Sequence, residues 1–121
     1  MLALSRQTVG VDLEHIRPLD WQRIALRFFH PEERAFLEQS AEPERDFFRI
    51  WTLKESYLKA EGTGFSVSPA SFAVLPEGAQ SARFFSETAY RFTRLAAFPN
   101  YCLSVCSLEE EVSPEVVIKQ F

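Results

Sequence analysis

The 121-residue sequence predicts a single α+β domain in which a mainly antiparallel sheet packs against two or three helices. Three observations lead to this prediction. Apolar and polar residues alternate near the N-terminus, apolar residues then recur at helical spacing as far as Gly62, and short apolar runs separated by turn residues follow Ser66. A strand, then helices, then a series of strands is an order typical of this class.

The first expected element is a half-buried strand over residues 8–14, where apolar side chains alternate with glycine and acids. Residues two apart on a strand project from the same side, with Cα atoms roughly 6.5–7 Å apart. We therefore expect Val11 and Leu13 to be buried. Asp12 and Glu14 are expected to project together from the opposite, polar side.

Two shorter helices and one long helix are expected next. Asp20 and His30 are placed to cap the shorter helices, and Pro31 suits a first helical turn. The long helix is expected to begin near Pro43 and to end at Gly62, because glycine favours a left-handed C-cap. The broad apolar face of this helix, bordered by Phe48 and Glu55, consists of Phe47, Ile50, Trp51, Lys54, Tyr57 and Leu58.

The remainder of the chain is expected to form short strands separated by turns. The expected strands cover residues 71–75, 82–86, 90–96, 101–108 and 115–120. A turn is expected at Pro76-Glu77-Gly78. Cys102 and Cys106 would lie about 13 Å apart on one strand, which is too far for a disulfide, so we expect two reduced thiols.

Composition limits the function classes. The net charge of −4 argues against a nucleic-acid-binding protein, which needs a clustered basic face. No run reaches the roughly 18 apolar residues of a membrane span, and residues 1–6 lack the features of a signal peptide. We therefore expect a cytoplasmic protein with neither a nucleic-acid nor a membrane partner. The 12 phenylalanines predict an aromatic core.

Three acids form a candidate metal site. Glu55 lies among large apolar residues of the long helix, where a carboxylate costs free energy unless a cation or hydrogen bonds compensate it. If this helix packs on the first strand, Glu55 meets Asp12 and Glu14. Carboxylates suit Mg²⁺, which keeps its other positions for waters and substrate phosphates. Lys54 and Lys59 would neutralise the phosphate charge, so these residues indicate a magnesium–phosphate site.

The same residues also have purely structural interpretations. Glu55 and Lys59 have the spacing of an ordinary helix salt bridge, worth about 0.2–0.5 kcal/mol. Glu33, in the first turn of a helix, would favour the positive helix terminus. Gly62 and Gly64 suit a helix cap and a turn better than phosphate contacts. Taken singly, these patterns leave both interpretations open.

Three segments, in order, resemble the 4'-phosphopantetheinyl transferases. They are Gly10-Val11-Asp12-Leu13-Glu14, Arg27-Phe28-Phe29-His30-Pro31-Glu32-Glu33 and Trp51-Thr52-Leu53-Lys54-Glu55-Ser56-Tyr57-Leu58-Lys59-Ala60-Glu61-Gly62. The sequence is similar to the C-terminal half of the larger, surfactin-synthetase-activating class. This similarity extends through Tyr101-Cys102-Leu103-Ser104-Val105-Cys106, so residues 1–121 are expected to form one half-domain of that fold.

The resemblance implies magnesium-dependent transfer of the 4'-phosphopantetheine group from coenzyme A to a serine of an acyl or peptidyl carrier protein. It implies that Asp12, Glu14 and Glu55 hold the metal. It further implies that Lys54 and Lys59 bind the phosphates of coenzyme A. Trp51 matches a core aromatic of the family, to which we assign no chemistry. The implied catalytic residues are Glu33, as the base for the serine proton, together with Lys54, Glu55 and Lys59.

The sequence also departs from the family pattern. In the larger class an N-terminal half precedes this region and supplies a Ser-His segment for coenzyme A, whereas this sequence holds no Ser-His or Thr-His pair. The small class, holo-acyl-carrier-protein synthase, has a similar length and works as a trimer. Three alternatives follow. The first is an active transferase that builds its coenzyme A site across a homo-oligomer interface. The second is a fragment, separately encoded half or decayed remnant that has the metal acids but needs a missing N-terminal half to bind coenzyme A, and the third is a non-catalytic module that docks carrier proteins or partner enzymes.

Overall fold

The computed structural model describes residues 9–62, 67–85, 90–95 and 99–107, and these form the predicted α+β fold. The described residues contain three helices and five strands, with one short 3-10 helix (η3) between the third helix and the second strand. The elements are β1 (Val9–His15), α1 (Trp21–Phe28), α2 (Pro31–Glu38), α3 (Pro43–Glu61), η3 (Pro69–Ser71), β2 (Val74–Glu77), β3 (Ser81–Phe84), β4 (Arg91–Leu95) and β5 (Tyr101–Ser107).

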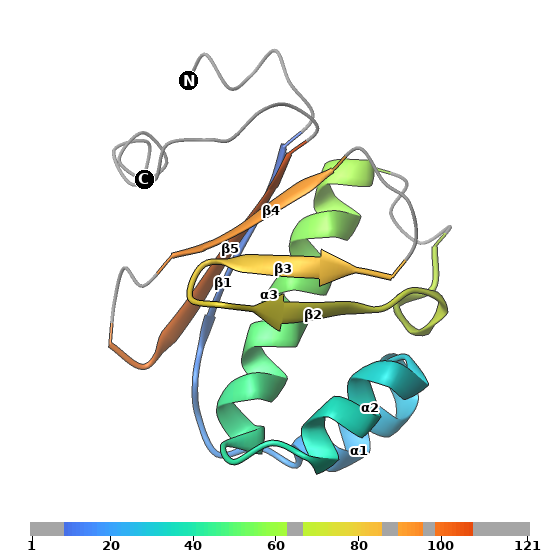
Figure 1. Ribbon diagram of the computed structural model, residues 1–121, viewed down its shortest axis with the longest axis vertical. Helices are drawn as coiled ribbons and strands as arrows, with labels where there is room; N and C mark the ends of the chain where they lie inside the picture. Colours follow the sequence, from blue (N-terminus) through green and yellow to red (C-terminus); the bar gives the residue numbers. More distant parts are fainter. Residues whose placement is uncertain (1–8, 63–66, 86–89, 96–98, 108–121) are drawn as a thin grey trace.

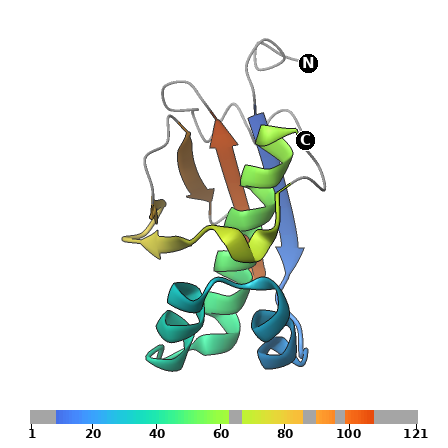
Figure 2. The ribbon, with the colours of Figure 1, turned by 90° about the vertical axis from the view of Figure 1, so that its right-hand side faces the viewer.

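The strands form two antiparallel sheets. β1, β5 and β4 make a three-stranded sheet in that order, and β2 pairs with β3 as a separate hairpin. Helix α3 runs along β1 and β5, while α1 and α2 lie together at its N-terminal end (Figures 1 and 2). The prediction of an antiparallel sheet packed against helices is confirmed, and α3 contacts strands of both sheets.

The contact between β1 and α3 is unusually close at Gly10. A Cβ atom at this position would collide with the backbone carbonyl of Ser56 and the backbone nitrogen of Ala60. Glycine therefore lets the strand backbone lie directly on the helix backbone. Asp12 shares the strand face of Gly10, so the acid side of β1 faces α3.

This packing reverses the predicted burial of β1. Asp12 is buried, whereas Leu13 is 45% exposed. Val11 is half-buried and packs, together with Val9, against a cluster of Leu95, Leu103 and Val105. The predicted alternation is present, but the helix covers the glycine–acid face because only that face allows its backbone to approach.

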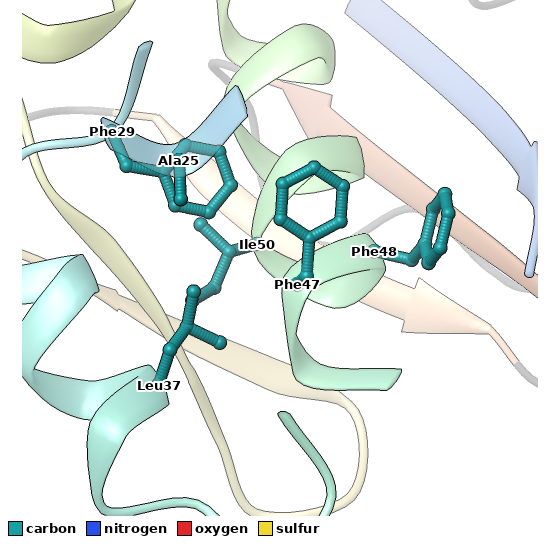
Figure 3. Packing of buried hydrophobic residues seen from close by; sticks show 6 residues of the cluster. All are labelled: Ala25, Phe29, Leu37, Phe47, Phe48 and Ile50. Carbon is teal, nitrogen blue, oxygen red and sulfur yellow. The ribbon is translucent and has the colours of Figure 1, made fainter. Parts of the chain in front are cut away.

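The largest core cluster joins the three helices (Figure 3). Phe29 stacks on Phe47 with ring centroids 5.1 Å apart, and Phe47 meets Phe48 edge-to-face at the same centroid distance. Such pairs add about 0.5–1.5 kcal/mol to the free energy gained by burial alone. The cluster consists of Ala25, Phe29, Leu37, Phe47, Phe48 and Ile50.

The helix boundaries follow the predicted signals. Asp20 caps α1 by accepting a hydrogen bond from the backbone of Arg23, and His30 caps α2. Gly62 ends α3 with a φ of 70°, the left-handed conformation that glycine adopts without strain. These three predictions from single residues are confirmed.

The region before β2 differs from the prediction. Residues 69–71 form a 3-10 helix capped by Ser68, and β2 begins only at Val74 and continues through Pro76. Proline fits there because β2 belongs to a two-stranded sheet, in which each strand has a free edge. The turn follows at Gly78, whose φ is 63°. The strand predicted over residues 115–120 and the turn at Gly64 lie outside the described residues.

Two further predictions concern the cysteines and the membrane. Cys102 and Cys106 both lie on β5 as free thiols, as predicted. None of the helices in the described ranges is long and apolar enough to cross a bilayer.

Candidate functional site

The close packing of β1 on α3 brings the three predicted metal acids together. Asp12 is buried on β1, Glu14 follows two residues later, and Glu55 projects from the middle of α3. Burial raises the pKa of Glu55, and the charges of Asp12 and Glu14 raise it further, against the lowering effect of Lys59. Burial likewise raises the pKa of Glu14, with Asp12 adding to this effect. The carboxylates therefore lie close enough to repel one another.

Lys59 compensates one side of this acidic cluster. Its Nζ atom donates to Asp12 Oδ1 at 2.8 Å and to the backbone oxygen of Val11 at 3.1 Å. Of the two interpretations of Lys59, an ordinary helix salt bridge with Glu55 is not the one that forms among the described residues, since the lysine reaches across to β1. The Lys59 side chain remains 52% exposed, so its ammonium group stays open to solvent.

The second oxygen of Asp12 is the feature of the cluster that bears most directly on the question of a cation. Asp12 Oδ2 is buried and has no hydrogen-bond partner among the described residues. An unsatisfied charged oxygen of this kind is costly, and a bound cation removes the cost. Oxygen ligands of carboxylate type suit Mg²⁺ and Ca²⁺. The donor set therefore fits the predicted magnesium ion.

The side chains do not form a closed metal cage. Within the ranges that the structure describes, no group of three or more His, Cys, Asp or Glu residues is arranged to hold an ion. Mg²⁺ uses few carboxylates and completes its shell with waters and substrate oxygens. A partial, open set of acids is therefore compatible with a metal that also binds a phosphate.

A cleft of about 490 Å³ opens beside Glu55 and Lys59 at the C-terminal half of α3. Its volume lies in the range of small-molecule sites, about 300–1,000 Å³. One edge is charged and the rest is mostly apolar, a combination that suits a ligand with a phosphate group and a less polar arm. The apolar lining consists of Phe28, Trp51, Leu58, Val67 and Pro69.

Trp51 lies at the junction of this cleft and the core. Its ring stacks on Phe47 and on Phe29, each at a centroid distance of 6.2 Å, and contacts Phe28 edge-on at 6.2 Å. The prediction of a core aromatic agrees with these contacts. The sequence does not reveal that Trp51 and the segment around Pro69 line one cleft, because these residues are distant in the chain and meet only in the folded structure.

Glu33 and Lys54 occupy a different position from the acidic cluster. Both are fully buried, and Lys54 Nζ lies 2.8 Å from Glu33 Oε1. Glu33 also accepts hydrogen bonds from the backbone of His30 at 2.8 Å and of Val74 at 2.9 Å. Lys54 donates to the backbone oxygen of Phe72 at 2.7 Å, and its ammonium lies 4.0 Å from the centre of the Phe72 ring.

Burial dominates the electrostatics of this pair. It raises the pKa of Glu33 and lowers the pKa of Lys54, while each partner opposes the shift of the other. Neither side chain lines the cleft. The pair connects α2, α3 and the start of β2, so it acts first as a link between these elements. The predicted catalytic and phosphate-binding roles of the two residues stay predictions.

Similarity to known proteins is found at the level of sequence family and of fold. The family model described as the 4'-phosphopantetheinyl transferase superfamily matches residues 8–106. The 4'-phosphopantetheinyl transferase gsp of Aneurinibacillus migulanus is 34% identical over 115 residues, which cover 92% of this chain and 48% of the relative. The 4'-phosphopantetheinyl transferase Sfp of Bacillus subtilis is 36% identical over 74 residues, covering 60% and 33%. The chain thus spans about half the length of these relatives or less.

Solved structures of shorter proteins match the fold more completely. The holo-[acyl-carrier-protein] synthase of Thermotoga maritima gives a TM-score of 0.69 at 16% identity and covers 95% of this chain and 75% of that one. The synthase of Bacillus anthracis, solved in complex with coenzyme A (3',5'-ADP), gives 0.64 at 18% identity and covers 87% and 98%. At these identities the likeness establishes the fold.

Proposed function

Because the chain belongs to the 4'-phosphopantetheinyl transferase superfamily, we propose that it transfers the 4'-phosphopantetheine group of coenzyme A to a serine of an acyl or peptidyl carrier protein. We further propose that the reaction depends on Mg²⁺. The observation that carries the proposal is the acidic cluster of Asp12, Glu14 and Glu55 beside the cleft, with an unsatisfied oxygen on Asp12. A site with these properties attracts a cation and, through it, a phosphate.

Asp12, Glu14 and Glu55 would hold the metal. When bound, Mg²⁺ supplies positive charge that stabilises the phosphate oxygens of coenzyme A during transfer. Lys59 would contribute a second positive charge at the same edge of the cleft, because its ammonium group is exposed and already lies at the cluster. Phosphoryl-type transfer depends mainly on positioning and on such charge neutralisation. The apolar cleft wall would hold the arm of the substrate and exclude water.

Glu33 is the candidate base that the family resemblance suggests for the serine proton. In the structure both of its oxygens accept hydrogen bonds and its side chain is fully buried, so a serine hydroxyl reaches it only after the contact with Lys54 or Val74 opens. The closed pair supports a positioning role, in which Glu33 and Lys54 hold α3 and therefore Glu55 in place. Loss of activity in Glu33→Gln without loss of folding would support the role as a base.

Helix α1 offers a surface for the carrier protein. Leu26 is 69% exposed on this helix, with Arg23 and Arg27 exposed around it. Carrier proteins are acidic, so a surface with arginines around an apolar residue is complementary in charge. We propose that the carrier protein docks on α1.

A second candidate function follows from the half-length match to the larger relatives. The chain would then be a non-catalytic half-domain that binds a partner half or a second copy of itself, or a module that docks carrier proteins.

Mass spectrometry of an apo carrier protein tests these proposals. The full chain is incubated with coenzyme A, Mg²⁺ and either an acyl or a peptidyl carrier protein, with Glu55→Gln and metal-free reactions as controls. A gain of the phosphopantetheine mass that both controls lack supports the transferase. No gain, together with binding of the carrier protein or self-association in solution, supports the second candidate function.

A further inference from the structure

A second pocket, of about 280 Å³, lies between the N-terminal half of α3, the turn of the β2–β3 hairpin and the ends of β4 and β5. It shares no lining residue with the cleft at Glu55 and Lys59. Three arginines reach it from two elements: Arg45 and Arg49 from α3, and Arg94 from β4. These residues are absent from the motifs that indicate the transferase.

Arg94 forms no direct ion pair within the described ranges. Its Nε atom donates to the backbone oxygen of Ser81 at 3.0 Å, and Nη2 donates to the backbone oxygen of Gly78 at 2.6 Å. Nη2 also lies 3.5 Å from the backbone oxygen of Glu77. These partners are neutral carbonyls, and no carboxylate lies within ion-pair distance of Arg94 in the part of the chain that the structure describes. The carbonyls fix the guanidinium group and leave Nη1 available for a ligand.

The other two arginines, Arg45 and Arg49, pair with acids of α3 or its N-cap and lie at the rim of the pocket. Arg49 Nη1 contacts Asp46 at 2.6 Å and Glu42 at 3.4 Å. Arg45 lies 4.0 Å from Glu42 and donates to the side-chain oxygen of Asn100. Three guanidinium groups thus meet two carboxylates, so one positive charge remains.

The electrostatics of Arg94 agree with this arrangement. Burial lowers the pKa of its guanidinium group and the nearby positive charge of Arg49 lowers it further, against the raising effect of Asp46. The guanidinium group still keeps its proton at neutral pH, since arginine is charged in proteins. A half-buried cation beside a like charge is stabilised by any anion that enters the pocket.

We propose that this pocket binds a phosphate group, either as inorganic phosphate or on a small phosphomonoester. Arginine forks match the oxygens of a phosphate and bind it through paired, charge-assisted hydrogen bonds. Donors face the pocket from α3 and from β4, so a tetrahedral anion with several oxygens fits them better than a carboxylate with two. Asn100 and the Thr52 side chain add polar groups to the lining.

Titration calorimetry of the full chain with inorganic phosphate tests the proposal, at constant ionic strength maintained with sodium chloride. We expect saturable binding that raises the melting temperature, because the ligand binds only the folded state. Arg94→Gln should raise the dissociation constant at least about tenfold, as loss of a charged hydrogen bond predicts. The matched control is Arg91→Gln, which removes the same charge from an exposed position on the same strand and should leave binding unchanged.

A second variant is needed because the Arg94 side chain holds the β2–β3 turn, so that Arg94→Gln could disturb the turn as well as the pocket. Arg45 is exposed and lies at the rim, so Arg45→Gln should leave folding intact and weaken binding roughly twofold to fivefold. Titration of a phosphomonoester and of acetate shows which anions the pocket accepts. Acetate should bind much more weakly than either phosphate compound.

Lys59→Gln separates this proposal from the proposed transferase site. Phosphate binding should persist in that variant, since Lys59 lies outside the pocket. Binding that is lost in Lys59→Gln but unchanged in both arginine variants would overturn the proposal and place the anion at the acidic cluster. No saturable binding by the unmodified chain, or equal binding of acetate, would also overturn it.

Discussion

Helix α3 carries two lysines, five positions apart, and each pairs with an acid from another element. Lys54 and Glu33 form a closed pair without exposed surface, surrounded by backbone groups that use the remaining hydrogen-bonding capacity of the carboxylate. Lys59 and Asp12 form an open pair, in which the lysine is half exposed and one carboxylate oxygen is buried without a partner.

The comparison shows that the same two residue types, a lysine and an acid, can serve to stabilise the fold in one place and to bind a ligand in another. A buried ion pair with complete hydrogen bonding has nothing left to offer a ligand, and removing either partner leaves an uncompensated charge. The open pair has an unsatisfied oxygen and an accessible cation beside the cleft. Lys54 should therefore matter most for stability and Lys59 for binding.

The largest effect is expected from Lys54→Met, which leaves Glu33 buried without its cation. The free energy of unfolding should fall by about 3–5 kcal/mol, the usual cost of breaking a buried pair from one side. Urea denaturation monitored by tryptophan fluorescence measures this difference. A loss below about 1 kcal/mol would mean that the pair opens readily and that Lys54 is available to a substrate.

The open pair predicts a large effect on ligand-dependent stability. Mg²⁺ with coenzyme A, at about 100 times the dissociation constant, should stabilise the chain by roughly 2.7 kcal/mol through binding to the folded state. Glu55→Gln should abolish this stabilisation while the ligand-free protein keeps its fold. The matched control is Glu44→Gln, an acid in the first turn of the same helix, away from the cluster. Thermal unfolding with and without ligands measures both variants, and an unfolded Glu55→Gln would contradict the assignment.

The acidic cluster also predicts the direction of a pH effect without metal. Burial and neighbouring acids raise the folded-state pKa of Glu55 above its ordinary value of 4.5. The folded state then holds this proton more tightly, so the contribution to stability is present below pH 4.5 and is lost as the pH rises through the raised pKa. Glu55→Gln should remove this part of the decline, which urea titrations at about pH 4 and about pH 7 measure. An identical decline in the variant would place its source elsewhere, for example at Glu33, whose pKa is also raised.

The smallest stability effect is expected from Lys59→Met, the same substitution on the other lysine of α3. Because Lys59 is 52% exposed, its ion pair is screened, and the loss should be about 0–1 kcal/mol. Affinity for coenzyme A, measured by titration calorimetry with Mg²⁺ present, should fall in this variant. A stability loss equal to that of Lys54→Met would remove the distinction between the open and the closed pair.

Local signals in the sequence predicted the helices well because each depends on a few adjacent residues. Asp20, His30 and Gly62 mark helix ends through contacts with their own backbone neighbours. The association of Asp12 with Glu55 was also predictable, since it needs only that the long helix packs on the acid side of the first strand.

Predictions that required long-range packing were less complete. The burial of Asp12 and the exposure of Leu13 depend on the backbone contact at Gly10, which the alternation of polarity does not reveal. The partner of Lys54 comes from α2. The Glu33–Lys54 pair is kept out of the cleft by further contacts, of Lys54 with Phe72 and of Glu33 with Val74. A separate β2–β3 hairpin was missed because short apolar runs do not specify which strands pair.

The contact between Gly10 and α3 also has a dynamic consequence. Since the backbones of β1 and α3 touch without intervening side chains, the strand cannot slide or rotate on the helix independently. The amides of β1 and those near Ser56 should therefore exchange with solvent through one shared opening event, in hydrogen-exchange terms a single cooperative unit. Asp12 and Glu55 belong to the same unit, so fluctuations that separate them require the local unfolding of both elements.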